Sequence, residues 1–282
     1  EIQQNFSNFE IFNIFCSNKR ILLFLFKEKI IIPDSTIANL FLKKEFLEKF
    51  YLFYFYPEFK NFFNEKKWED ISEQIDRQIL VDIDKEKIEN NIEEFENNRN
   101  KGQNDEFICG LIQNDSIEDF ISYVTKFNTP LNMHLKKSIF ETNSFLIDKN
   151  PTLIEYSAFF GSIQVFKYLF MNDVELTPSL WPYVIHGKNP ELIHFLEENK
   201  ILPEENSYVN CLIESIKCHH NDIANYINDN LVSNLNQNEL NLNSFALEFF
   251  NFQFFPDEIP NDFNVLYDLC EYDYITIVSL LL

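Results

Sequence analysis

Glycine is scarce in this chain: 4 of its 282 residues are Gly, namely Gly102, Gly110, Gly161 and Gly187. A phosphate-binding loop needs several glycines at fixed spacing, because only glycine lets the backbone approach the phosphates closely. These four are too widely separated to build such a loop, and Gly187-Lys188 is followed by Asn189 where the loop requires Ser or Thr. A nucleotide site of this type is therefore excluded.

Basic residues are also few. Lys and Arg total 23 against 45 Asp and Glu, which gives a formal net charge of −22. A chain this acidic repels phosphate backbones and anionic lipid surfaces. We therefore expect no nucleic-acid partner.

Long apolar runs and regular cysteine spacing are both missing. The longest apolar run, residues 21–26, is far shorter than the roughly 20 residues that a helix needs to cross a bilayer, so we expect no membrane insertion. Five cysteines, an odd number without a pairing pattern, favour a reducing compartment over a disulfide framework. Together these absences predict a cytoplasmic protein.

The chain has internal repetition between Pro151 and Leu282. The clearest copy runs from Thr152 to Phe170: an apolar segment, then Gly161, then a second segment with apolar residues three and four positions apart. This pattern predicts two helices joined by a tight turn. A unit of this size cannot bury its own apolar face, so consecutive copies are expected to stack on one another.

Further copies follow at offsets of 27, 58 and 112 residues from the first. Each offset aligns apolar residues: Trp181, Leu212 and Leu266 fall on Ile154, and Leu192, Ile223 and Ile277 fall on Val165. The clearest units are residues 151–176, 177–206, 207–233 and 262–282. Residues 107–124 read as a weak first repeat or as a helical pair that caps the stack.

Pro182 tests this register. Proline inside a helix breaks it, because the ring blocks the preceding turn and the residue has no N–H to donate. With Ser179 as N-cap, Pro182 falls at the third helical position, where an N–H has no intrahelical partner. The register that aligns the repeats therefore also accommodates the proline.

The repeated unit resembles the ankyrin repeat, whose usual form reads Thr-Pro-Leu-His, one variable residue, Ala-Ala, two variable residues and Gly, followed by a second helix. Matching positions are held by Thr152, Ile154, Ser157, Ala158, Gly161, Val165, Leu169 and Phe170. From about Phe107 to Tyr226 the chain looks like the divergent ankyrin proteins of some parasitic protists, in which a helical domain of unknown function adjoins the repeats. The resemblance implies an all-α, ankyrin-like helical-repeat solenoid.

Residues 1–106 show no such repeat and are predicted to form an N-terminal helical region. Apolar spacing favours a helix that begins at Ser35 and ends at Pro57, and two more amphipathic runs follow. The aromatic segment 50–59, with Phe62 and Phe63, is either a Phe-rich core, which this spacing favours, or an exposed protein-binding patch. The polar segment 97–106 is the expected linker to the repeats, which would occupy residues 107–282.

No catalytic motif stands out, and we predict neither an enzyme nor a bound cofactor. The best arrangement for a metal combines cysteines on one helix face with histidines at its end: Cys211, Cys218, His219 and His220. The repeat register places Cys211 beside a core position and the histidines in a turn, so packing is the favoured interpretation and no metal is predicted. His186 and His194 have no cysteine near them in sequence.

The repeats predict a non-catalytic scaffold that binds an unidentified protein. Ankyrin-like solenoids present their first helices and adjoining turns as a concave surface, and the resemblance implies a binding site at the variable positions of those helices. These positions are Tyr156, Phe159, Phe160, Tyr183, His186, Glu214 and Lys217. Aromatic residues there favour an interface because they supply large contact area; the alternative for Phe159 and Phe160 is packing against the N-terminal helices.

The alternative function is an enzyme or metal-binding subunit whose site is assembled from residues distant in sequence. The Cys and His residues and the acidic surplus are its support. The sequence identifies neither the partner nor the oligomeric state. Because the last copy ends at Leu281-Leu282 with apolar positions still uncovered, we expect further repeats beyond it.

Overall fold

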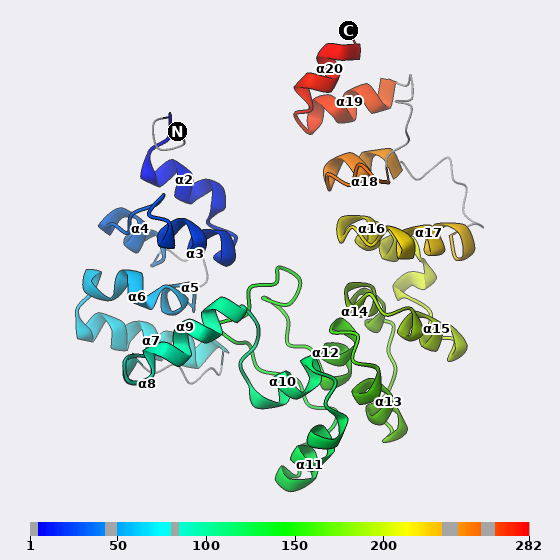
Figure 1. Cartoon of the computed structure of the whole chain (residues 1–282), viewed down its shortest axis with the longest axis horizontal. Helices are drawn as coiled ribbons and strands as arrows, with labels where there is room; N and C mark the ends of the chain where they lie inside the picture. The colour runs from blue at the N-terminus through cyan, green and yellow to red at the C-terminus, as the bar shows by residue number, and fades with distance from the viewer. Residues whose placement is uncertain (1–4, 43–49, 80–84, 233–241, 255–262, 282) are drawn as a thin grey trace. The chain divides into compact units, whose positions relative to one another are not determined.

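The structure is a computed structural model that describes residues 5–42, 50–79, 85–232, 242–254 and 263–281 (Figure 1). Its regular elements are helices, and no β-strand occurs within these ranges. The predicted all-α fold class is confirmed. None of the described helices is both long enough and apolar enough to cross a bilayer.

The chain forms two compact units, each built from two stretches of sequence. The first unit contains Glu1–Gly110 and His134–Pro151, and the second contains Leu111–Met133 and Thr152–Leu282. The predicted boundary at residue 107 places residues 134–151 with the repeats. They belong to the first unit, where Ile139 and Phe140 are buried in the core and Ile147 packs against it.

Short helices make up the first unit. In chain order they are α2 (Asn8–Phe15), α3 (Lys19–Lys27), α4 (Ser35–Leu40), α5 (Phe50–Tyr54), α6 (Tyr56–Phe59), the 3-10 helix η1 (Lys60–Phe62), α7 (Glu65–Ile79), α8 (Lys85–Asn90) and α9 (Ile92–Lys101). The helix α10 (Phe107–Gln113) contains residues of both units.

The helix predicted from Ser35 to Pro57 is interrupted. Asp34, one residue before the predicted start, caps α4 because its carboxylate accepts the Ile37 N–H at 2.9 Å. Pro57 lies in the first turn of α6, where a missing N–H costs no hydrogen bond. Residues 43–49 of the predicted helix lie outside the described residues.

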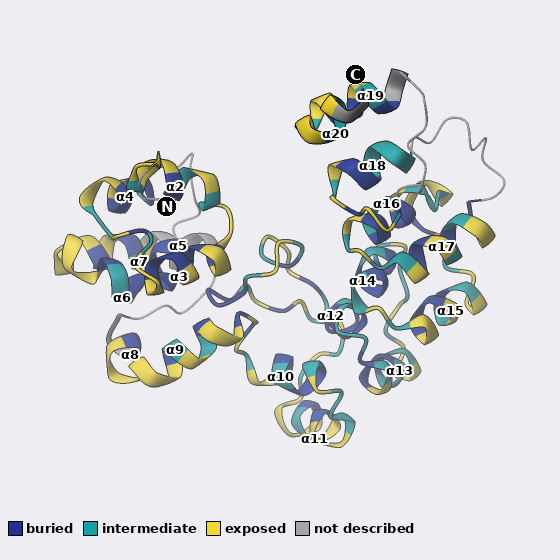
Figure 2. Cartoon of the chain, turned by 45° about the horizontal axis from the view of Figure 1, so that its top comes forward, coloured by how far each residue is buried: buried dark blue, intermediate teal, exposed yellow. Residues whose placement is uncertain are grey.

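An aromatic core holds the first unit together. Every residue from Tyr51 to Tyr56 is at most 6% exposed, and Figure 2 shows α5 among the buried segments. Rings of neighbouring helices meet edge to face, with centroids 5.5 Å apart for Phe26 and Phe55. This geometry brings the positive edge of one ring to the negative face of the other. The core interpretation is confirmed for residues 51–56 and Phe59, whereas Phe62 is 39% exposed.

Arg99 on α9 is buried in this core. Its guanidinium forms ion pairs with Glu58 at 2.8 Å and with Glu96 at 2.6 Å. Burial raises the pKa of Glu58 even though Arg99 lies beside it. Residues 97–106, predicted to be a linker, are therefore helical as far as Lys101 and packed into the core through Arg99.

Lys19 on α3 is the second buried cation. Its ammonium donates hydrogen bonds to the backbone carbonyls of Ile139 at 2.9 Å and Glu141 at 3.0 Å. The ammonium also lies 4.8 Å from the ring centroid of Tyr51, a favourable cation–π distance. Lys19 thus fixes the returning segment 134–151 to the first unit.

The second unit consists of helix pairs, except that α18 has no second helix among the described residues. After α10 these helices are α11 (Ile117–Phe127), α12 (Leu153–Phe159), α13 (Ile163–Met171), α14 (Leu180–Gly187), α15 (Pro190–Glu198), η2 (Glu204–Asn206), α16 (Val209–Lys217), α17 (Asn221–Asn230), α18 (Leu242–Glu248), α19 (Phe263–Glu271) and α20 (Ile275–Leu281). We call α10, α12, α14, α16, α18 and α19 the first helices. From α12 onward each packs on the next, and Figure 1 shows them following one another.

Each first helix ends in the same left-handed turn. The turn residue has a positive φ in six places: Asp115, Gly161, Lys188, His219, Phe250 and Asp273. In each turn its N–H donates to the carbonyl three residues earlier, and in five of them the next N–H donates to the carbonyl five residues earlier. This Schellman motif satisfies carbonyls that a helix end leaves without partners. The predicted offsets of 27, 58 and 112 residues from Gly161 all lead to such a turn, so the predicted register is confirmed.

Two of the six turns lie outside the four clearest predicted units. Asp115 ends α10, in the segment read as a weak first repeat. Phe250 ends α18, which the sequence did not predict, because a phenylalanine occupies the position that Gly161 marks in the clearest copy. Residues 233–241 and 255–262, on either side of this segment, lie outside the described residues.

Pro182 lies at the third position of α14, as predicted, and Ser179 is the N-cap residue. The Ser179 hydroxyl does not cap its own helix. It donates a hydrogen bond to Glu155 Oε1 of the preceding pair at 2.8 Å. The register was therefore predicted correctly, whereas the role of the cap side chain was not.

A second repeated hydrogen bond ties each helix pair to the one before it. The residue after the left-handed turn donates from its side chain to a carbonyl at the end of the preceding first helix. These five side chains, which we call the rungs, are Ser162 to Ile112 (2.6 Å), Asn189 to Gly161 (2.9 Å), His220 to Ile185 (2.9 Å), Asn251 to Ile216 (2.8 Å) and Tyr274 to Leu247 (2.6 Å). A carbonyl only accepts, so His220 carries a proton on Nδ1.

The Asn189 rung differs because the two backbones approach each other closely there. A Cβ on Gly187 would lie 2.1 Å from the carbonyl oxygen of Ala158, which is a steric clash. Only glycine, which has no Cβ, fits at this position. The Ala158 carbonyl is the equivalent of the acceptors of the other four rungs. With Gly187 against it, Asn189 bonds to Gly161 instead.

Candidate functional site

The predicted partner-binding residues come from three consecutive first helices. Tyr156 and Phe159 lie on α12 with Phe160 as its C-cap, Tyr183 and His186 lie on α14, and Glu214 and Lys217 lie on α16. Lys217 is exposed, and four others, Phe159, Phe160, His186 and Glu214, are half-buried. The structure therefore offers these five residues at or near the surface.

The two tyrosines are buried, which corrects the expectation that they face a partner. Tyr156 is 1% exposed, and its hydroxyl accepts a hydrogen bond from the Gln113 amide at 2.8 Å. Tyr183 occupies the same repeat position 27 residues later and is 6% exposed. Burial, followed by the charge of Glu155, raises the pKa of its phenol. Both tyrosines therefore pack inside the stack, whereas Glu214, at the same position of the following repeat, is half-buried.

The remaining residues form a continuous row. The Phe159 ring stacks on the His186 imidazole, with centroids 5.2 Å apart and planes at 26°. His186 Nε2 lies 2.9 Å from Glu214 Oε1, and Lys217 Nζ lies 3.4 Å from Glu214 Oε2. With the neighbouring Phe160 and Cys218, we call these residues the first-helix row: Phe159, Phe160, His186, Glu214, Lys217 and Cys218.

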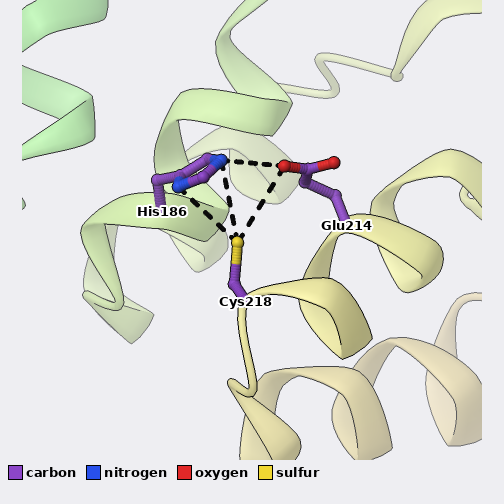
Figure 3. Close-up of side chains that lie close together, drawn as sticks. All are labelled: His186, Glu214 and Cys218. Atoms are coloured by element: carbon purple, nitrogen blue, oxygen red, sulfur yellow. Dashed lines mark hydrogen bonds and ion pairs between the residues drawn. The ribbon is translucent and has the colours of Figure 1, made fainter. Parts of the chain in front are cut away.

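Cys218, the C-cap of α16, faces His186 and Glu214 (Figure 3). Its Sγ lies 3.6 Å from Nδ1 and 3.7 Å from Nε2 of His186, and 3.9 Å from Glu214 Oε1. Within the described ranges, this is the one group of three or more His, Cys, Asp or Glu side chains whose donor atoms are close enough to share a metal ion.

The two acidic groups of this cluster differ in charge. The hydrogen bond from His186 lowers the pKa of Glu214 below its ordinary value, so its carboxylate is ionised near neutral pH. Burial, followed by the charge of Glu214, raises the pKa of the Cys218 thiol to about 12. Near neutral pH the cluster therefore contains an ionised carboxylate, on Glu214, beside a neutral thiol, on Cys218.

The metal ligands that the sequence put first do not come together. Cys211 is 3% exposed and packs in the core, where burial raises the pKa of its thiol to about 12. His219 Nε2 is bonded to the Phe249 carbonyl, and His220 Nδ1 is bonded to the Ile185 carbonyl, both at 2.9 Å. The left-handed turn at His219 sends the two imidazoles to different carbonyls, so Cys218 alone of that set belongs to the cluster.

The repeat register explains why His186 meets Cys218. His186 stands at the Phe159 position of its repeat, and the next repeat has Glu214 and Cys218 at the Tyr156 and Phe160 positions. In this pair of repeats the residue at the Phe159 position contacts two positions of the following first helix. His186 and Cys218 are 32 residues apart, so a search for ligands close together in sequence misses the cluster. Alignment of the repeats would have revealed it.

A separate pocket of about 250 Å³ lies between α15 and α17, each of which is the second helix of its pair. Residues of α15, α17 and the turns before them line it, among them Ile193, His194, Ile223 and Tyr226. None of the predicted partner-binding residues contributes to this pocket, so the first-helix row and the pocket are different surfaces.

Comparison with known protein families found no matching family model, and comparison with curated proteins and with solved structures found no match. The function of the first-helix row is therefore inferred from its own geometry.

Proposed function

We propose that the chain is a non-catalytic scaffold, an ankyrin-like solenoid that binds a protein partner along the first-helix row. The observation that supports this is the unbroken contact from Phe159 through His186 to Glu214 and Lys217. It brings variable positions of three successive repeats onto one surface. A partner lying across the row would contact α12, α14 and α16 together.

The chemistry of the row defines the partner. Phe159 and Phe160 are half-buried rings, which lose little side-chain freedom when they are covered. Lys217 supplies an exposed ammonium in a chain whose net charge is −22. The partner that fits is a protein segment with an apolar side chain for the rings and a carboxylate for Lys217.

The test uses the full chain with a photo-crosslinking residue at position 217, mixed with an extract of the native cell. We expect a protein to be crosslinked from position 217 but not from position 164, which is exposed on α13 outside the row. Recovery of the same proteins from both positions would contradict the proposal.

A charge reversal then measures the contribution of the row. Lys217→Glu should weaken binding of the captured protein by about 1–2 kcal/mol, because a carboxylate would face a carboxylate. Lys167→Glu is a matched control, since Lys167 lies on α13 and also pairs with one glutamate, Glu191, at 3.5 Å. Equal loss in the two variants would show that overall charge, and not the row, determines binding.

A further inference from the structure

The His186, Glu214 and Cys218 side chains converge on one point. Figure 3 shows the imidazole, the carboxylate and the thiol turned toward one another from two helices of consecutive repeats. The separations are 2.9 Å for Nε2 to Oε1, 3.7 Å for Nε2 to Sγ and 3.9 Å for Oε1 to Sγ. Each side chain therefore contacts both of the others.

This convergence distinguishes the cluster from a nucleophilic triad. In such a triad the imidazole lies between the nucleophile and the carboxylate, which bind opposite ring nitrogens and stay apart. Here Glu214 Oε1 lies 3.9 Å from the sulfur, within the longest range of a weak hydrogen bond. The three donor groups therefore lie within 4.8 Å of one another instead of forming a relay.

The separations match the edges of a metal coordination sphere. Zinc holds a thiolate sulfur at about 2.3 Å and an imidazole nitrogen or carboxylate oxygen at about 2.0–2.1 Å, so tetrahedral geometry sets these donors about 3.3–3.6 Å apart. The Nε2 to Sγ separation is 3.7 Å, and the others are 2.9 and 3.9 Å. The sulfur also lies 3.6 Å from Nδ1 of the same ring, so zinc binding requires rotation of the His186 or Cys218 side chain that keeps Sγ near Nε2 and moves it away from Nδ1.

The donor types select the metal. Calcium and magnesium prefer oxygen ligands alone, whereas sulfur and imidazole nitrogen favour zinc. We propose that His186 Nε2, Glu214 Oε1 and Cys218 Sγ bind one Zn²⁺ ion, which joins α14 to α16 and keeps a fourth coordination position for water. Binding requires the neutral Cys218 thiol to release its proton to solvent as the sulfur–zinc bond forms. The resulting thiolate and the Glu214 carboxylate balance the two positive charges of the ion, and the neutral imidazole completes the set.

Neighbouring residues hold the ligands in place. The Phe159 ring stacks on the imidazole of His186 and restricts its rotation. Lys217 Nζ lies 3.4 Å from Oε2 and 3.5 Å from Oε1 of Glu214, so it orients the carboxylate as a whole. Partners of this kind orient metal ligands, and their loss weakens metal binding.

The test is a zinc titration of the full chain, stripped of metal with a chelator, kept reduced and monitored with a competing chromophoric chelator. We expect one zinc ion per chain. Cys218→Ser, His186→Gln and Glu214→Gln should each weaken zinc binding by at least about 10–100-fold, the range already seen when only an outer partner is lost. Cys270→Ser and His194→Gln are the controls, because both residues are exposed and lie outside the cluster.

Absence of zinc binding by the folded chain would overturn the proposal, and so would equal binding by Cys218→Ser. Cobalt gives an independent measurement on the unaltered chain, because sulfur coordination to Co²⁺ produces a charge-transfer absorption in the near ultraviolet. No such absorption would also overturn the proposal, even if a variant failed to fold.

Bound zinc should also stabilise the second unit. At a free zinc concentration of about 100 times Kd the thermal midpoint should rise by about 5–10 °C. The rise should vanish in His186→Gln and persist in His194→Gln. Zinc binding is measured without any protein partner, so its failure would leave the proposed scaffold function untouched.

Discussion

In the first unit, Lys19 and Arg99 reach groups 120 and 41 residues away in sequence, whereas in the second unit the rungs reach back 27 to 50 residues to the preceding helix pair. These two contacts come from buried charged side chains, although neutral groups such as the Thr142 hydroxyl also make long-range bonds in this unit. The rungs are neutral, and they recur from one helix pair to the next. In the first unit, Lys19 and Arg99 each attach distant segments of the chain to one another. In the second unit, five weaker bonds of one kind attach successive helix pairs.

This difference bears on the free energy of unfolding. Removing one member of a buried ion pair leaves the other charged and unpaired, which costs about 3–5 kcal/mol. Removing one neutral hydrogen bond costs about 1–3 kcal/mol when the acceptor stays buried. Single substitutions should therefore be more severe at the buried cations than at the rungs.

The two units can be followed separately by fluorescence. The chain has two tryptophans, of which Trp68 is buried in the first unit and Trp181 in the second. A Trp181→Phe background reports unfolding of the first unit, and a Trp68→Phe background reports unfolding of the second. The predictions below use these two backgrounds.

The largest effect is expected at Arg99. Arg99→Met should lower the free energy of unfolding of the first unit by about 3–5 kcal/mol, because it leaves the Glu58 carboxylate buried without its counter-charge. Urea unfolding monitored by Trp68 measures the change. Arg20→Met is the control, because Arg20 is exposed on α3. Similar losses in both variants would show that burial of the cation is not what stabilises this unit.

The next largest effect is expected at Ala158, which is 0% exposed. Ala158→Asp should destabilise the second unit by roughly 3 kcal/mol, because it buries an unpaired charge between first helices. Gln164→Asp, on the exposed side of α13, should change stability by at most about 0.5 kcal/mol. Equal shifts in the unfolding midpoint monitored by Trp181 would contradict the stacking of α12 on α14.

A smaller loss is expected at a rung. Asn251 is 1% exposed and donates to the Ile216 carbonyl at 2.8 Å and to Asn221 Oδ1 at 2.7 Å. Asn251→Ala should cost about 1–3 kcal/mol and accelerate hydrogen exchange in α18. Asn172→Ala is the control, since that amide is exposed and bonds within its own helix end. Unchanged exchange in Asn251→Ala would mean that the rung does not attach α18.

The smallest effect is a gain. Lys188 adopts a left-handed conformation with φ of 51°, which glycine adopts without strain. Lys188→Gly should stabilise the second unit by about 0.5–1 kcal/mol, whereas Lys167→Gly, inside α13, should destabilise it by about 1 kcal/mol. Opposite signs in thermal unfolding would confirm the turn, and a loss in both variants would contradict it.

Apolar columns in the sequence predicted the register of the repeats. Gly161, Lys188, His219 and Asp273 follow the predicted offsets, although only one of them is glycine. The packing of first helices on one another maintains these columns, so they persist while the turn residue changes. The turn at Phe250 was missed because neither a glycine nor a clear second segment marks it.

The sequence predicted side-chain environments less well. Tyr156 and Tyr183 were expected at the surface, because the alignment shows which positions vary but not which of them face the preceding helix. The segment 134–151 was assigned to the wrong compact unit for a related reason. Ile139 and Phe140 have no helical periodicity, and the ammonium of Lys19 that binds this segment is 120 residues away.

Each rung donates to a backbone carbonyl, so the bond requires no particular amino acid at the acceptor position. This has an evolutionary consequence. Every helix end presents a carbonyl whatever its side chains are, so a duplicated pair of helices inserted into the array would find an acceptor already present. The donors Ser162, Asn189, His220, Asn251 and Tyr274 show that a hydroxyl, an amide, an imidazole and a phenol all fill the role. An array joined in this way can lengthen or shorten by whole repeats without a compensating substitution in its neighbours.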